Sequence, residues 1–262
     1  MHVKSKSRSK LVAIYDWPES FDPKVFFECA KKVFPVLASR VNVVRLSITD
    51  NNGRERGRWI EKCSDAVDFF TDDVDSDVAI EFYGAASDLS RPLDSCDFYA
   101  CISFARDTRY FIFTSADVLV DAASINSFFR ILSENGWVGY GFGCIERSIE
   151  NPFYYAVGVT WGYPSSDEQK ALASANAKWM SQMVSPRDNK AYLKGKIRDV
   201  YEINVLNANH LEANIDKGVT LYSAIRDNGL GSLYVMEGGV YVWILKSSEL
   251  LDARQRLAWL II

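Results

Sequence analysis

The chain has 262 residues, of which 48% are apolar and 24% are charged. A globular protein of this length and composition buries a large core without help from disulfides or a structural metal. Its net charge of -4 argues against general binding to nucleic-acid backbones, which requires clustered lysine and arginine, and it favours a basic partner.

The N-terminal residues alternate serine with lysine and arginine. Because so polar a run cannot join a core, we expect a flexible basic leader over residues 1–10, with a nucleic-acid-binding arm as the alternative. We expect residues 11–262 to fold as a single globular α+β unit. The start of the chain lacks the apolar stretch of a signal peptide, and no run reaches the roughly 20 apolar residues that span a bilayer. We therefore expect a cytoplasmic protein with no membrane contact.

The first quarter of the chain predicts a β-α-β-α order. Residues 11–17 are typical of a strand, and residues 23–40 repeat apolar side chains at helical spacing, with Pro35 expected to kink or stop that helix. The β-branched residues of 41–49 predict a second strand. Residues 58–70 return to helical spacing, and we expect a second helix there.

The centre of the chain changes to short apolar or alternating runs. Such runs occupy residues 77–83, 98–104 and 109–114, and the last two are separated by a connection of ordinary hairpin length. We therefore expect an antiparallel meander of three strands, and mixed or antiparallel sheets packed with helices for the whole chain.

A helix followed by Asn-Gly and a strand is predicted twice. The first helix covers residues 124–134 before Asn135-Gly136, and the second covers residues 221–227 before Asn228-Gly229. Two interpretations stay open. Either the chain contains two similar α/β halves with a break near residues 150–162, or the repetition is a coincidence of common helix-ending residues.

A long helix is predicted over residues 166–183. Ser165 is expected to cap it, with Glu168 reaching back to complete the capping box. We expect one stripe of this helix to join the core: Leu172, Ala175, Trp179 and Met183. Strands are expected after it at residues 198–206 and 240–245.

Residues suited to catalysis are scarce. Only His2 and His210 are histidines, and no GxSxG motif is present to hold a serine nucleophile. We expect His210 to be a partly exposed structural residue. The glycine-rich stretches lack the order of nucleotide-binding loops. Five cysteines without CxxC spacing are expected to be buried and reduced: Cys29, Cys63, Cys96, Cys101 and Cys144. We expect no catalytic residue, no cofactor and no metal.

Acidic residues cluster in one segment: Asp65, Asp68, Asp72, Asp73, Asp75 and Asp77. The spacing of its last three aspartates resembles the start of a calcium-binding EF-hand loop, but Val78 stands where that loop requires glycine and Gly84 where it requires glutamate. A solvated turn is the simplest interpretation. The alternative is that these carboxylates attract a basic protein partner over long range.

Three aromatic and glycine motifs carry a resemblance to a known family. They are Tyr155-Ala-Val-Gly-Val-Thr-Trp161-Gly162, the long helix with Lys178-Trp179, and the closing Gly-Ser-Leu-Tyr-Val … Val-Tyr-Val-Trp243-Ile-Leu. Together they resemble the α+β bacterial immunity proteins called immunity protein 52, over most of the chain. The resemblance implies a non-enzymatic protein that neutralises a polymorphic toxin, often a nuclease delivered by type VI secretion.

The sequence therefore predicts a stoichiometric inhibitor of a cognate toxin, a nuclease with a basic cleft, and no direct contact with nucleic acid. The six clustered aspartates are the expected contact residues, because they can occupy a cleft built for phosphates. Two other classes stay open: an enzyme with Asp and Glu as acid and base in a cleft between two halves, and a module that binds a small ligand.

Overall fold

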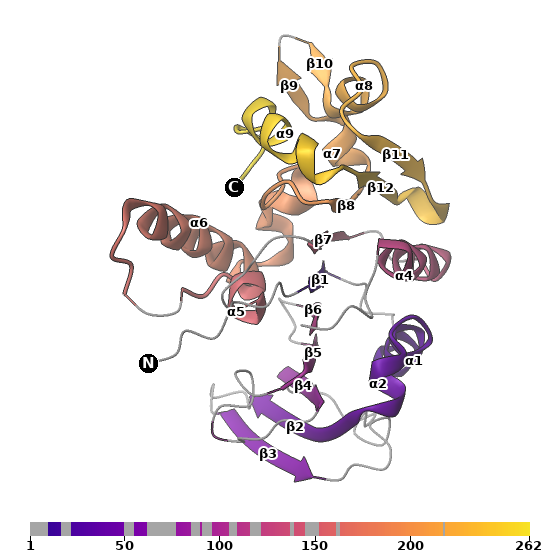
Figure 1. The fold of residues 1–262 in the computed structure, drawn as a ribbon, viewed down its shortest axis with the longest axis vertical. Coiled ribbons are helices and arrows are strands. Elements are labelled where there is room, and N and C mark those ends of the chain that lie inside the picture. The colour runs from indigo at the N-terminus through magenta and orange to yellow at the C-terminus, as the bar shows by residue number, and fades with distance from the viewer. Residues whose placement is uncertain are drawn as a thin grey trace.

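The computed structural model describes residues 10–16, 22–49, 55–61, 77–84, 90, 96–104, 109–115, 122–136, 139–144, 152–160, 163–216 and 218–262. Within these ranges, ten strands form one antiparallel sheet, with helices packed on both of its faces (Figure 1). The expected α+β class is confirmed, and the sheet is antiparallel rather than mixed.

The large sheet runs through the whole molecule. Its strands are β1 (Lys10–Tyr15), β2 (Val41–Thr49), β3 (Glu55–Glu61), β4 (Asp77–Gly84), β5 (Phe98–Phe104), β6 (Arg109–Ser115), β7 (Tyr140–Cys144), β8 (Ile203–Leu206), β11 (Ser232–Val235) and β12 (Tyr241–Ile244). Their spatial order is β11-β12-β8-β7-β1-β6-β5-β4-β2-β3. Strands β9 (Asn214–Asp216) and β10 (Val219–Thr220) form a separate two-stranded ribbon.

The two largest cores lie on opposite faces of the sheet, and a third, small cluster contains Val43, Tyr83, Tyr99 and Cys101. Val12 and Ile14 of β1 point into the first core, whereas Leu11, Ala13 and Tyr15 point into the second, as the alternation of a strand requires. The first core is covered by α1 (Pro23–Val33), α2 (Pro35–Ser39) and α4 (Ala122–Glu134). The second is covered by α5 (Pro152–Val157), α6 (Asp167–Val184), α7 (Ala208–Glu212), α8 (Leu221–Arg226) and α9 (Leu250–Arg256).

The prediction for residues 23–40 is confirmed. Helix α1 starts after Asp22, whose carboxylate accepts a hydrogen bond from Lys24 N (2.8 Å). The helix ends at Val33, and α2 begins at Pro35. Proline interrupts the helix because it has no N–H to donate and its ring excludes the preceding turn.

The helix predicted over residues 58–70 is wrong where the structure describes it. Residues 55–61 form β3, which pairs along its length with β2, from Glu55 opposite Thr49 to Glu61 opposite Val43. A run of so few residues with helical spacing fits a strand as well as a helix. Pairing with β2 decides in favour of the strand. The first quarter is therefore β-α-α-β-β, and residues 62–76 lie outside the described ranges.

Other boundaries agree with the sequence or need small corrections. The meander is confirmed as β4, β5 and β6, and Gly136 ends α4 with a left-handed φ of 81°. Lys10, which we assigned to the leader, opens β1, whereas residues 1–9 lie outside the described ranges. The strand expected at residues 198–206 begins only at Ile203.

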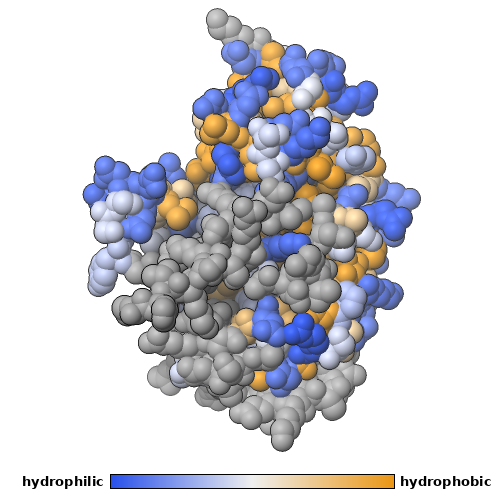
Figure 2. Space-filling view, viewed as in Figure 1, coloured by the Kyte–Doolittle hydropathy of each residue, from blue (hydrophilic) through white to orange (hydrophobic). Residues whose placement is uncertain are grey.

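Helix α6 is capped one residue later than predicted. Ser166 and Gln169 form the capping box, in place of Ser165 and Glu168. Trp179 is buried as expected, but Leu172 is 44% exposed. The first turns of α6 extend away from the sheet (Figure 1), and that arm is mainly hydrophilic on the face shown in Figure 2. Apolar residues there have no core to join.

The predictions for the cysteines and for the membrane are tested only over the described residues. Among the described residues, four cysteines are free thiols: Cys29, Cys96, Cys101 and Cys144. Cys96 is half-buried and the others are buried, while Cys63 lies outside the described ranges. No helix in the described part of the chain is both long enough and apolar enough to cross a bilayer.

Candidate functional site

The acidic segment lies in the chain between β3, the strand at one edge of the sheet, and β4, the third strand from that edge. Of its six aspartates, Asp77 opens β4 opposite Thr49. The structure does not describe the other five: Asp65, Asp68, Asp72, Asp73 and Asp75. The preceding strand, β3, is the outermost of its edge, and it ends at Glu61 opposite Val43. The chain thus leaves β3 opposite one end of β2 and enters β4 opposite the other end.

The calcium-loop pattern ends in a strand. Residues 77–84 form β4, which pairs with β2 on one side and β5 on the other. A strand is extended, whereas a calcium loop must curl so that its alternating oxygens surround one ion. Among the described residues, no group of three or more His, Cys, Asp or Glu side chains is arranged to hold a metal.

A buried carboxylate lies on the strand that follows the acidic segment. Glu81 of β4 pairs with Arg45 of β2, and Arg45 Nη1 lies 3.1 Å from Glu81 Oε2. Two phenols donate to the same carboxylate, Tyr83 at 2.9 Å and Tyr99 at 3.3 Å. The sequence analysis missed this cluster, although alternation along β2 and β4 places Arg45, Glu81 and Tyr83 on one face.

The surroundings of Glu81 keep neighbouring groups protonated. Burial, reinforced by the charge of Glu81, raises the pKa of the Cys101 thiol and of the Tyr83 phenol above their usual values. Burial also raises the pKa of Tyr99, with smaller contributions from Cys101 and Glu81. A neutral thiol is a poor nucleophile, and neutral phenols remain hydrogen-bond donors. The cluster therefore holds a carboxylate in place.

A second polar network converges on one carbonyl at the end of α5. The Ala156 oxygen accepts hydrogen bonds from Tyr15 Oη (2.9 Å), Trp179 Nε1 (2.8 Å) and Arg198 Nη1 (2.6 Å). Arg198 Nη2 also donates to Asn176 Oδ1 (3.0 Å). The last carbonyls of a helix have no partner within the helix, so side chains from β1, α6 and the segment before β8 complete this one.

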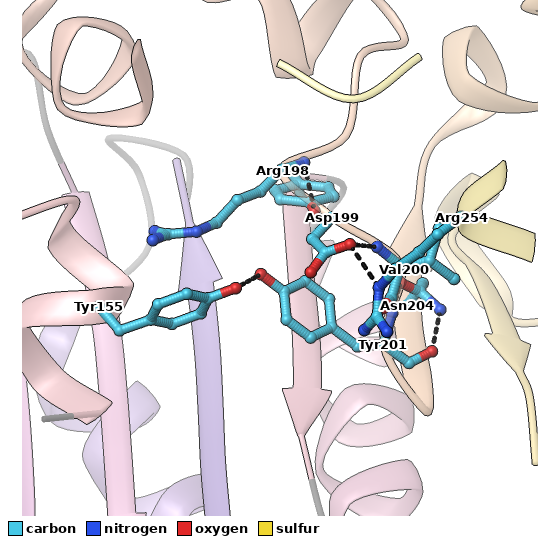
Figure 3. A network of polar contacts seen from close by, with 8 residues as sticks. Tyr155, Arg198, Asp199, Val200, Tyr201, Asn204 and Arg254 are labelled. Carbon is cyan, nitrogen blue, oxygen red and sulfur yellow. Dashed lines mark hydrogen bonds and ion pairs between the residues drawn. The ribbon is translucent and has the colours of Figure 1, made fainter. Parts of the chain in front are cut away.

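Further bonds fasten the same segment to its surroundings (Figure 3). The guanidinium carbon of Arg198 lies 4.1 Å from the ring centroid of Tyr155, whose hydroxyl is 2.8 Å from that of Tyr201. Arg254 of α9 donates from Nε to Asp199 Oδ1 (2.8 Å) and from Nη2 to Val200 O (2.6 Å). These bonds join α5, α9 and the chain that enters β8.

A buried ion pair lies at the end of β1. Lys190 Nζ is 3.2 Å from Asp16 Oδ1, and the Tyr192 hydroxyl donates to the other carboxylate oxygen of Asp16. Asp16 also has a φ of 56°, a left-handed conformation that costs a non-glycine residue about 1–3 kcal/mol. The two partners over-determine the position of this carboxylate and hold the strained backbone.

His210 is buried, not partly exposed as predicted. Its ring stacks on Tyr140 with centroids 5.5 Å apart, and Nδ1 lies 2.8 Å from Asn207 Oδ1. Within the described part of the chain, Nε2 makes no hydrogen bond. Burial lowers the pKa of His210 to about 4, against smaller opposing effects from the backbones of Lys196 and Asn207. His210 is thus a neutral structural residue at pH 7.

In the comparisons with known proteins, no protein family, no curated protein and no solved structure matched the chain. The large aromatic residues Tyr155, Trp179 and Trp243, which carry part of the resemblance to immunity proteins, are buried, whereas other residues of the same motifs, such as Lys178, Tyr234 and Val235, are exposed. Tyr155 and Trp179 belong to the network around Arg198, and Trp243 Nε1 donates to Leu230 O (2.7 Å). Buried residues of this kind specify packing, so they say little about the choice of a partner.

Proposed function

We propose that this protein is a cytoplasmic immunity protein that binds and neutralises a cognate antibacterial toxin as a stoichiometric inhibitor. The proposed toxin is a nuclease effector of type VI secretion. One observation carries the proposal: the acidic segment connects β3, the strand at one edge of the sheet, with β4, the third strand from that edge. The family resemblance and the net charge of -4 support it independently.

The physical basis is electrostatic. A nuclease cleft that binds phosphates carries positive potential, and clustered carboxylates increase the rate of encounter with such a surface. The aspartates of the segment are the proposed contacts: Asp65, Asp68, Asp72, Asp73, Asp75 and Asp77. Tyrosine and tryptophan, which the chain contains in quantity, are typical of the desolvated centre of such interfaces.

The buried networks support the same function through rigidity. The carboxylates of Asp16 and Glu81 and the guanidinium of Arg198 are bonded to neighbouring side chains or carbonyls. A scaffold held in this way loses little conformational entropy when a partner binds, so more of the contact energy is available for affinity.

The test is charge reversal with a matched control. Asp65, Asp68, Asp72 and Asp73 are changed to lysine, and the control reverses four exposed acidic residues elsewhere: Asp188, Glu212, Asp227 and Glu237. The partner is the neighbouring gene product that co-purifies with this chain. We expect the first variant to associate at least about tenfold more slowly, with a weaker dependence on salt.

The control variant should retain most of the association rate and should still protect cells that express the toxin. Equal losses in both variants would show a general effect of net charge, and unchanged kinetics in the first variant would remove the acidic segment from the interface. Failure of every neighbouring gene product to bind or to be neutralised would overturn the proposed function itself.

A second candidate function is favoured by one observation. At Asp16, a strained backbone places a carboxylate beside an amine, that of Lys190, and a phenol, that of Tyr192. Strained backbone often occurs at active sites, so an enzyme with an acid-base pair there is the alternative. Turnover of a metabolite in cell extract that the purified protein catalyses and Lys190→Met abolishes would support it.

A further inference from the structure

The chain contains three Asn-Gly sequences, which share one chemical reactivity. They are Asn52-Gly53, Asn135-Gly136 and Asn228-Gly229, and the first lies outside the described ranges. In Asn-Gly, the backbone nitrogen of glycine attacks the asparagine Cγ, a succinimide ring forms, and the side-chain amide leaves as ammonia. Water then opens the ring at either carbonyl to give aspartate or isoaspartate. No oxidant or reductant takes part.

At Asn135-Gly136, both reacting groups are held by the helix end. The nucleophile, Gly136 N, donates a hydrogen bond to Ser133 O (2.9 Å). The leaving group, Asn135 Nδ2, donates to Ile131 O (2.7 Å). Both bonds must break before Gly136 N can approach the side chain, so the native helix end protects this asparagine.

At Asn228-Gly229, neither group is held in this way. Both residues are exposed, and within the described part of the chain neither the Asn228 side chain nor Gly229 N forms a hydrogen bond. Gly229 has a φ of 66°, and the space beside its Cα is open. We propose that Asn228 is a site of spontaneous deamidation and isomerisation, in which water is the second reactant. This inference is independent of the proposed function.

The structure also indicates what the modification changes. Immediately after Gly229 the chain is fixed, because Leu230 is buried and its carbonyl accepts a hydrogen bond from Trp243 Nε1. Gly231, with a φ of 77°, approaches Ile244 so closely that an added Cβ would lie 2.5 Å from its carbonyl oxygen. Isoaspartate adds one carbon to the backbone here, directly before β11. We expect it to loosen the pairing of β11 with β12.

The test measures deamidation of the full-length folded protein at mildly alkaline pH by peptide mapping and mass spectrometry. We expect Asn228 to convert about tenfold or more faster than Asn135, since two hydrogen bonds protect the latter. In urea, where both sites are unfolded, the two rates should become similar. Equal rates in the folded protein would overturn the proposal, and so would a rate difference that persists unchanged in urea.

Two variants separate the charge from the extra backbone carbon. Asn228→Asp adds only the charge when it is measured fresh, because Asp-Gly also forms the succinimide, more slowly and with loss of water. Asn228→Gln suppresses the reaction because the ring it would form is larger. Hydrogen exchange is followed at Met236 N, which donates to Val240 O (2.8 Å) next to β11. We expect faster exchange in aged wild-type protein than in fresh Asn228→Asp or in aged Asn228→Gln. Unchanged exchange in wild-type protein converted to isoaspartate would overturn the predicted loosening of β11.

Discussion

At the scale of residues, buried polar groups are bonded to partners from distant parts of the chain. The Ala156 carbonyl accepts three donors from three different segments, and one of them, Arg198, also reaches α6 through Asn176. Buried polar atoms are costly without partners, so each of these bonds constrains the position of a whole segment. The network thus specifies how α5, α6 and β8 meet.

Arg198 should therefore contribute strongly to stability. Arg198→Met removes the charged donors to Ala156 O and Asn176 Oδ1, and we expect it to lower the free energy of unfolding by about 2–4 kcal/mol. Arg198→Lys can reach only one acceptor and should lose about half of that. Urea denaturation measures both. The control is Arg130→Met on the exposed surface of α4, which should cost less than about 0.5 kcal/mol. Similar losses at both arginines would contradict the role of the network.

His210 predicts a pH dependence of stability. Its pKa is about 4 in the folded protein and about 6.5 when unfolded. Between these values the unfolded chain binds more protons, so the free energy of unfolding decreases as the pH falls from 6.5 to 4, by about 3 kcal/mol in total. The free energy of unfolding should have lost this full amount below pH 4.

The measurement is the stability of wild type minus that of His210→Phe across this range, which cancels the carboxylates that titrate in both proteins. Phenylalanine retains the stacking on Tyr140 but has no titrating nitrogen. A difference that does not change with pH would show that His210 is not the group responsible.

At the scale of elements, local patterns predicted where the chain would turn or stop more reliably than which structure it would form. Pro35 separates α1 from α2, and Gly136 ends α4. These residues act through their own backbone geometry, so no distant contact can change their effect. By contrast, residues 55–61 became β3 because β2 was available for pairing.

Gly158 should be less replaceable than Gly136, although both have left-handed φ values, 82° and 81°. A Cβ at Gly158 would lie 2.7 Å from Asn176 O and Met180 N of α6, whereas nothing lies within 4 Å at Gly136. Gly136→Ala should cost about 1–2 kcal/mol from backbone strain alone. Gly158→Ala should cost about 1–3 kcal/mol more, because α5 and α6 must separate. Thermal or urea unfolding measures both, and equal costs would show that this close approach is not required.

At the scale of the whole molecule, strands from the N-terminal and C-terminal parts of the chain belong to one sheet. Strand β7 pairs with β1 on one side and with β8 on the other, with Gly141 opposite Val205 and Gly143 opposite Ile203. Both cores extend across this junction, since Ile203 belongs to the first and Leu206 to the second. The segments expected from a duplication do form helix, Asn-Gly and strand in turn, as α4 with β7 and α8 with β11. Superposition of two halves remains a prediction.

A continuous sheet predicts that the described strands unfold as one unit. In native-state hydrogen exchange with urea, the slowest amides of β5 and of β12 should exchange with the same free energy and the same dependence on urea. The physical reason is that Val242 of β12 and Ile102 of β5 belong to the same core on one face of the sheet. Earlier opening of β12 would instead indicate two halves that unfold independently, as the alternative domain prediction requires.

The sequence by itself determined the α+β class, all three strands of the meander, the interruption at Pro35 and the small number of histidines, because periodicity and backbone restrictions act over a few residues. Only the tertiary structure decided that residues 55–61 form a strand, that His210 is buried and which groups pair with the buried charges. Lys190 and Asp16 are 174 residues apart in the chain, and Arg45 and Glu81 are 36 apart. Whether a charge is paired in a core or free to meet another protein depends on such distant neighbours, and local sequence does not contain them.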